Sequence, residues 1–124
     1  MILGLGIDLV SISKIAESVK SASFRRKVFT PSEIEICETF ANSAEHYSGK
    51  FAAKEAYMKA IGKGIRQEVW FTQVEVLNGE TGAPYVQVSG EAENTLISLE
   101  VESVHISISH TGEMAVAVVI LETS

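Results

Sequence analysis

The sequence predicts a single α+β domain, in which N-terminal helices pack on a small and mainly antiparallel sheet. Helical spacing and helix caps dominate the first half of the chain, and alternating strand patterns dominate the second half. The chain has 124 residues, of which 46% are hydrophobic and 21% charged. This length and composition fit one folded domain over residues 1–124 and exclude wholesale disorder.

Apolar spacing and caps define the elements of the first half. The apolar run of residues 1–8 predicts a short buried strand whose glycines allow close approach of another element. Residues 11–20 predict a helix, and residues 24–29 predict a link to the next one. The start Thr30-Pro31-Ser32-Glu33 offers a capping box and a proline at the first helical position. This helix is expected to run to about Phe40.

The later elements follow one Ala-rich helix. Residues 50–61 predict that helix, which Gly62 and Gly64 end. After it the pattern alternates, which indicates strands. The expected elements are a hairpin of residues 71–77 and 84–88 around a turn at 78–82, a short helix at 91–99, and a second hairpin of residues 104–109 and 114–121.

Several function classes are excluded by what the sequence lacks. A single cysteine excludes a disulfide framework and a Cys-rich zinc site, and Cys37 lies among apolar helix positions as a packed thiol. Gly4-Leu5-Gly6 lacks the third glycine of a dinucleotide fingerprint, and no P-loop is present. The apolar run Met1–Ile7 is too short and lacks the basic flank of a signal peptide or membrane span.

The charge is divided unevenly along the chain. The net charge of −6 argues against broad nucleic-acid binding. Residues 1–66 carry all ten cations and seven acids, whereas residues 67–124 carry nine acids and no cation. Two interpretations are open. Either the acidic residues of the second half form only a solvated surface, or the uneven charge indicates that anionic ligands and acidic partners bind to the N-terminal half.

Two carboxylates are candidate metal ligands. Asp8 ends an apolar strand, where a charge needs a partner, although it also suits the N-terminus of the following helix. Glu55 lies among apolar or small side chains, although it can also pair with Lys59 one turn later. Together they form a hard oxygen pair that suits Mg²⁺ completed by substrate phosphates.

Cations and one histidine indicate a phosphate-bearing ligand. The lysines recur along the helix that carries Glu55, at Lys50, Lys54, Lys59 and Lys63. His110 ends a strand before a turn and can face a ligand or be an ordinary polar turn residue. The other histidines, His46 and His105, lack such a context, and we expect surface or satisfied roles for both. Trp70 and Phe71 are expected in the core or at an interface.

The combination of motifs resembles one family over the whole chain. The matching segments are Gly6-Ile7-Asp8, Thr30-Pro31-Ser32-Glu33, Phe51-Ala52-Ala53-Lys54-Glu55-Ala56 with Lys59, Gly62-Lys63-Gly64-Ile65, Gly82-Ala83-Pro84 and Ser107-Ile108-Ser109-His110-Thr111. In this order they resemble the holo-[acyl-carrier-protein] synthase family, the short bacterial 4′-phosphopantetheinyl transferases.

The resemblance implies a reaction and an assembly. Such enzymes move the 4′-phosphopantetheine arm of coenzyme A to a serine of apo-acyl-carrier protein, for fatty acid biosynthesis in the cytoplasm, and release adenosine 3′,5′-bisphosphate. They require magnesium and form homotrimers with sites at the subunit interfaces. The nucleophile belongs to the carrier protein, which agrees with a chain that offers none of its own. The serine proton would go to Glu55 or to a metal-bound water.

The resemblance also implies roles for individual residues. Asp8 and Glu55 match metal ligands, and catalysis is assigned to Glu55, Lys59 and His110. Coenzyme binding is assigned to Lys50, Lys54, Lys59, Gly62, Gly64, Pro84, His110 and Thr111. Lys14 stands where the family often has an arginine that contacts the carrier protein, and lysine keeps the charge without the bidentate geometry.

Two further hypotheses concern assembly and docking. Residues 115–120 are apolar on both faces of the predicted strand, so copies of the chain are expected to cover the outer face in a homotrimer. The dense cationic run Arg25-Arg26-Lys27, with Lys14, is the expected docking face for an acidic carrier protein, unless these cations only keep a loop soluble.

Two alternative functions use the same residues. A magnesium-dependent phosphodiesterase would remove phosphopantetheine from holo-carrier protein. A non-catalytic coenzyme A-binding module would keep the fold alone. Retention of Asp8, Glu55 and Lys59 disfavours the second alternative. The mass of apo-carrier protein after incubation with coenzyme A and Mg²⁺ separates these alternatives from a transferase.

Overall fold

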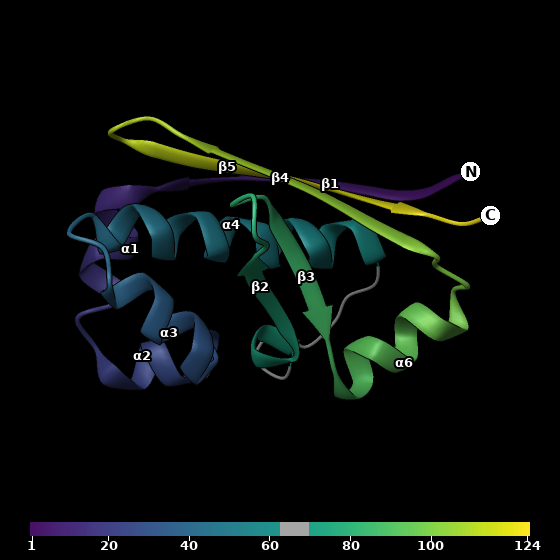
Figure 1. Ribbon diagram of the computed structural model, residues 1–124, viewed down its shortest axis with the longest axis horizontal. Coiled ribbons are helices and arrows are strands. Elements are labelled where there is room, and N and C mark those ends of the chain that lie inside the picture. Colours follow the sequence, from purple (N-terminus) through teal and green to yellow (C-terminus); the bar gives the residue numbers. More distant parts are fainter. Residues whose placement is uncertain (63–69) are drawn as a thin grey trace.

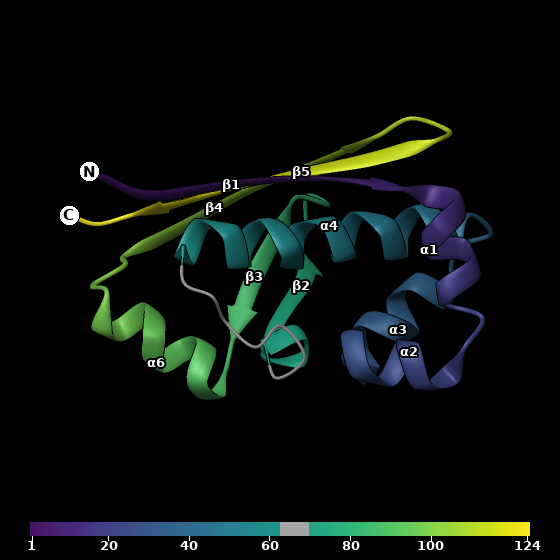
Figure 2. The ribbon, with the colours of Figure 1, turned by 180° about the vertical axis from the view of Figure 1, so that it is seen from behind.

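Helix α4, Ser43–Ile61, lies at the centre of the molecule. The computed structural model describes residues 1–62 and 70–124. Figure 1 shows α4 between a three-stranded sheet on one side and a layer of shorter elements on the other. Figure 2 shows the same order of layers from behind. The two faces of α4 therefore organise the rest of the fold.

The three-stranded sheet combines a strand from the start of the chain with two strands from its end. Strand β1 (Ile2–Ser11) and strand β4 (Ser103–His110) both pair antiparallel with the central strand β5 (Met114–Glu122). The side chains of β5 alternate, and Ala115, Ala117, Val119 and Leu121 are buried. One face of the sheet therefore packs on α4, and the other face is the outer surface in Figure 1.

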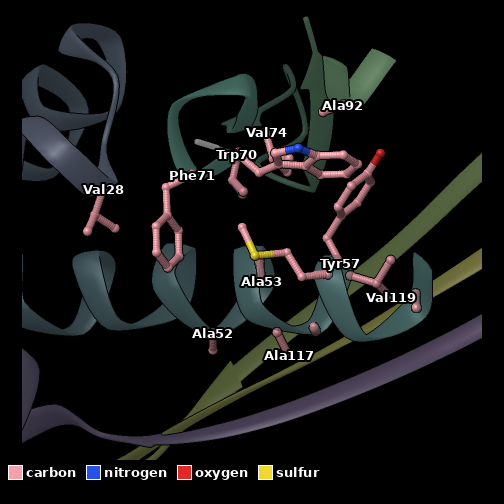
Figure 3. Close-up of a cluster of buried hydrophobic side chains, with 14 of the residues drawn as sticks. Val28, Ala52, Ala53, Tyr57, Trp70, Phe71, Val74, Ala92, Ala117 and Val119 are labelled. Carbon is pink, nitrogen blue, oxygen red and sulfur yellow. The ribbon is translucent and has the colours of Figure 1, made fainter. Parts of the chain in front are cut away.

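The second layer consists of short elements. It contains the helices α1 (Ile12–Ser18), α2 (Ala22–Val28), α3 (Pro31–Glu38) and α6 (Gly90–Ser98), the 3-10 turn Phe71–Gln73, and an antiparallel hairpin of β2 (Val74–Asn78) and β3 (Pro84–Val88). Figure 3 shows Tyr57 of α4 with Trp70 and Phe71 in the core between α4 and this layer. The aromatic side chains thus fix the second layer on α4.

Close approach of β1 to α4 depends on two glycines. A Cβ atom on Gly4 would lie 2.1 Å from the carbonyl oxygen of Ala60, and one on Gly6 would lie 1.9 Å from that of Ala56. Any side chain at these positions would displace the strand from the helix. The glycines therefore set both the distance and the register between β1 and α4.

Much of the expected fold is confirmed. The chain is α+β with antiparallel sheets, the capping box of Thr30 and Glu33 is present, and Gly62 ends α4 with a positive φ of 75°. Both hairpins are present. Cys37, Trp70 and Phe71 are buried, as expected. None of the helices in residues 1–62 and 70–124 has the length and hydrophobicity needed to cross a bilayer.

Four expected boundaries are wrong. Strand β1 extends to Ser11, so Asp8 lies inside the strand rather than at its end, and alternate residues of β1 are exposed rather than buried. Residues 24–29 are not a link, because Ser21 caps helix α2 through the backbone N–H of Phe24. Helix α4 begins at Ser43 rather than at Lys50, and Gly49 lies inside it. Residues Phe71–Gln73 form a 3-10 turn before β2, because the buried Phe71 side chain packs against Phe51.

Candidate active site

Asp8 is placed by the contact between β1 and α4. Moving two residues along β1, from Gly4 to Gly6, moves the contact four residues back along α4, from Ala60 to Ala56. Two strand residues and four helix residues both span about 6 Å. Every second residue of β1 therefore faces every fourth residue of α4. Asp8 follows on the same face of β1, one step further along α4, within reach of the long side chain of Lys59.

Lys59 meets Asp8 directly. The Lys59 ammonium donates to Asp8 Oδ1 at 2.9 Å and to the carbonyl oxygen of Ile7 at 3.0 Å. The Asp8 side chain is 14% exposed and that of Lys59 is 56% exposed. Glu55 precedes Lys59 by four residues and therefore lies on the same side of α4. The structure thus brings together the two predicted metal ligands and the predicted catalytic lysine on one strip of the molecule.

The donor set of this strip fits magnesium. Asp8 and Glu55 offer carboxylate oxygens, and no cluster of three or more His, Cys, Asp or Glu suited to a metal occurs within residues 1–62 and 70–124. Mg²⁺ is commonly held by one or two carboxylates and completed by water and phosphate oxygens. A two-carboxylate strip beside a lysine is therefore consistent with a metal shared with a phosphorylated substrate.

A separate pocket lies at the other end of α4. It is enclosed by the start of α4, the β2–β3 hairpin and the end of β4, and its lining residues are Glu45, His46, Gly49, Lys50, Val76, Asn78, Gly82, Pro84, Ile108 and His110. Among the residues expected to bind coenzyme, it brings together Lys50, Pro84 and His110. It includes neither Asp8, Glu55 nor Lys59.

Basic groups dominate the pocket. Lys50 is 4% exposed, and its ammonium donates to the carbonyl of Val76 at 2.6 Å and to Asn78 Oδ1 at 3.4 Å. Burial lowers the pKa of Lys50. Burial, followed by the charges of His110 and Lys50, lowers the pKa of His46. An anion in the pocket would offset the positive charges that, after burial, disfavour protonation of His46, so the pocket is suited to a phosphate.

Among the described residues that line this pocket, Glu45 is the only carboxylate. Glu45 Oε2 lies 3.5 Å from His110 Nδ1. Thr111 follows in the exposed turn, where its hydroxyl accepts the backbone N–H groups of Glu113 and Met114. This turn fixes the end of β4 and therefore the position of His110.

The two regions lie on different sides of α4. His46 and Glu55 are nine residues apart, which places them on opposite sides of a helix with 3.6 residues per turn. Within one chain, Glu55 therefore points away from the pocket that holds His46. The strip and the pocket are two separate regions of the described residues.

The scan against known families matches residues 4–119 to the 4′-phosphopantetheinyl transferase superfamily. The chain belongs to that superfamily. A holo-[acyl-carrier-protein] synthase of Koribacter versatilis is 43% identical over 98% of this chain and 99% of its own length. The members of the superfamily that resemble this chain are therefore similar to it from end to end.

Solved structures of the superfamily share the fold. The holo-[acyl-carrier-protein] synthase of Neisseria meningitidis matches with a TM-score of 0.90 and 29% identity, covering 99% of this chain and 100% of that one. The synthase of Bacillus anthracis, in complex with CoA (3′,5′-ADP), matches with a TM-score of 0.83 and 38% identity, covering 100% of this chain and 99% of that one.

Lys54 does not belong to a coenzyme site. Its side chain is fully buried, and its ammonium donates to Glu33 Oε1 at 2.7 Å and to the carbonyls of Phe71 and Val74. All three ammonium protons therefore have partners in the core. The assignment of Lys54 to coenzyme binding in this superfamily member is wrong, because the lysine joins α4 to α3 and β2.

The remaining predicted residues fall into three groups. Gly62 is exposed at the end of α4, and Gly64 lies outside the described residues. The docking residues Lys14, Arg26 and Lys27 are exposed, whereas Arg25 is half-buried and donates to the carbonyl of Val19. His105 is satisfied by Glu122 at 2.9 Å, as expected. His46, in contrast, lines the pocket.

Residues at the start of α4 were missed from the sequence. Glu45 and His46 enter the pocket because α4 begins seven residues before the expected start. Glu45 itself was the signal for the earlier helix start, because an acidic residue is typical of the first turn of a helix. The sequence places Asn78 only in a turn, and Gly82 in that turn and in the matching segment Gly82-Ala83-Pro84, without predicting a pocket.

Proposed function

We propose that this chain transfers 4′-phosphopantetheine from coenzyme A to a serine of apo-acyl-carrier protein and releases adenosine 3′,5′-bisphosphate. The observation that carries this proposal is full-length similarity to synthases of that name, including the coenzyme-bound Bacillus anthracis structure at 38% identity. The residues of both parts of the site agree with this chemistry. Carboxylates and lysine suit a phosphoryl centre, and the basic pocket suits the remaining phosphate of the coenzyme.

We assign Asp8 and Glu55 to holding Mg²⁺, which when bound would neutralise charge on the phosphates. Lys59 binds a phosphate oxygen of the coenzyme and stabilises the charge that develops during transfer. The carrier serine attacks phosphorus, and Glu55 is the residue of the chain assigned to accept its proton. Positioning and charge neutralisation thus account for catalysis.

We assign the pocket to the nucleotide end of the coenzyme. Lys50 and His110 line the pocket and would supply the positive charge for an anionic group, and Pro84 contributes an apolar wall. Gly62, Gly64 and Thr111 keep their proposed coenzyme roles on the basis of family resemblance. The proposed roles are therefore divided between the strip and the pocket.

We propose that a homotrimer completes the site. Leu5, Ile7 and Leu9 are exposed on the outer face of β1, next to Val116, Val118 and Ile120 of β5. Such a contiguous apolar face is typical of an interface. A second copy bound to this face would bring its own pocket near the strip of the first copy. One coenzyme could then contact two subunits.

We propose that the carrier protein docks on α1 and α2. Lys14 lies on α1, and Arg26 and Lys27 lie in the last turn of α2. A local cationic surface can steer an acidic partner although the whole chain is acidic. We further propose a cytoplasmic role in fatty acid biosynthesis, in keeping with a single, free cysteine.

Product analysis tests the transfer. Coenzyme A, Mg²⁺ and the protein should give adenosine 3′,5′-bisphosphate only when apo-carrier protein is present. A carrier whose serine is replaced by alanine is the matched control and should give none. Release of the bisphosphate without carrier would instead indicate hydrolysis of the coenzyme.

A further inference from the structure

The contact between Lys59 and Asp8 has a consequence for metal binding. The Asp8 carboxylate is mostly buried between β1 and α4, and Lys59 supplies a positive partner through Oδ1. A carboxylate in such a place is costly without a counter-ion. Lys59 therefore satisfies Asp8 in the protein as the structure shows it, while it also binds the carbonyl of Ile7.

A metal ion held by Asp8 would compete with Lys59 for that carboxylate. A divalent cation on Asp8 would lie within a few ångströms of the Lys59 ammonium, and like charges at that distance repel strongly in a partly buried site. Lys59 can leave without unpacking the core, because its side chain is more than half exposed. Its flexible four-carbon stem allows the ammonium to move while the backbone of α4 stays in place.

We propose that Lys59 is an exchangeable counter-ion: it neutralises Asp8 in the metal-free protein, leaves Asp8 when the metal binds, and is thereby released to the phosphates of the coenzyme. This inference rests on the proposed function, since it assumes a metal at Asp8. It predicts that metal and coenzyme favour each other's binding, because the phosphates hold the displaced ammonium.

Metal binding by the intact protein tests the exchange without relying on activity. Mn²⁺, observed by electron paramagnetic resonance, is titrated into wild type, Lys59→Met and Lys20→Met. Lys20 is the matched control, because it also pairs with a carboxylate, Glu17 at 3.0 Å, but on the exposed surface of another element. Lys59→Met should bind Mn²⁺ roughly 3- to 10-fold more tightly than wild type, the range expected for loss of one competing ion pair. Lys20→Met should match wild type.

Lysine labelling observes the exchange in the wild-type protein. A brief pulse of acetic anhydride is followed by peptide mass analysis, with and without Mg²⁺. An amine held by two acceptors must break those contacts before it can react, so Mg²⁺ should raise the acetylation rate of Lys59 and leave that of Lys20 unchanged. In Asp8→Asn, Mg²⁺ should have no effect on Lys59.

The outcomes separate this inference from the proposed function. If wild type binds Mn²⁺ but Lys59→Met binds it no more tightly, and Mg²⁺ leaves Lys59 labelling unchanged, the exchange is overturned and the transferase proposal stands. If wild type binds no Mn²⁺ even with coenzyme A present, both the proposed metal role and the exchange fail. If Lys59→Met binds Mn²⁺ less tightly, Lys59 supports the metal rather than competing with it.

Discussion

Gly6 lies so close to Ala56 that a Cβ atom at position 6 would be 1.9 Å from the Ala56 carbonyl oxygen. This contact holds β1 against α4 and so places Asp8 beside Lys59. We expect Gly6→Ala to reduce the free energy of unfolding by about 1–3 kcal/mol, since the backbone must shift to accept the methyl group. Urea denaturation measures the loss. Gly112→Ala is the matched control, because nothing lies within 4 Å of its Cβ position. Equal stability of the two variants would contradict this view of β1 packing.

The buried pair of Lys54 and Glu33 is expected to be essential for stability. Lys54→Met leaves the Glu33 carboxylate buried without its cation, which costs about 3–5 kcal/mol. Lys20→Met removes a fully exposed pair and should cost less than about 1 kcal/mol. Chemical denaturation compares the two. A stable Lys54→Met protein with a raised KM for coenzyme A would contradict this structural role and would show that Lys54 contributes to coenzyme binding.

The exposed apolar face of the sheet leads to an assembly prediction. Light scattering at micromolar concentration should give the mass of a trimer for the wild-type protein. Leu5→Glu places a charge opposite Ile120 on this face and should shift the mass to that of the monomer. Ile97→Glu, at an equally exposed apolar residue on α6, should leave the trimer intact. A wild-type monomer would refute the assembly.

The docking surface can be tested by charge reversal. Lys14→Glu combined with Arg26→Glu should raise the KM for carrier protein and weaken its salt dependence, because the steering charge is reversed. Arg25 is left unchanged, since it binds the carbonyl of Val19. The KM for coenzyme A should change little. A change in the coenzyme parameter alone would show that the docking surface is misplaced.

The carboxylates can be tested individually. Asp8→Ala and Glu55→Ala should each lower kcat/KM by roughly 100-fold or more, the effect of removing a main electrostatic stabiliser of a transition state. Glu93→Ala, at an exposed carboxylate of α6, is the control and should retain activity. Near-normal turnover of either site variant at limiting Mg²⁺ would contradict the metal assignment.

Local chemistry made much of the fold predictable. The capping box at Thr30 and Glu33, the glycine that ends α4 at Gly62 and the alternation in β5 each act within a few residues, and all three are present. Helix α2 was missed because its sequence is short and cationic. It depends on tertiary contacts, such as that of Phe24 with Phe51, which spacing along the chain does not reveal.

Long-range contacts explain the error at Lys54. Lysines spaced along a helix resemble a solvated or ligand-binding face, and Lys59 does lie at the surface. Lys54 instead meets Glu33, 21 residues earlier, and two carbonyls of residues that follow the helix. Its partners come from other elements, so only the assembled fold shows them. The opposite sides of α4 occupied by Glu55 and His46 were not foreseen for another reason: the helix was expected to begin at Lys50, which left His46 outside it.

The mass of the carrier protein is the most direct test of the proposed reaction. Apo-acyl-carrier protein is incubated with coenzyme A, Mg²⁺ and the protein, and the intact carrier is measured by mass spectrometry. We predict a carrier heavier by one phosphopantetheine group on its serine, and no change when EDTA removes the metal. An unchanged carrier mass in the presence of Mg²⁺, with folded protein that binds coenzyme A, would contradict the proposal.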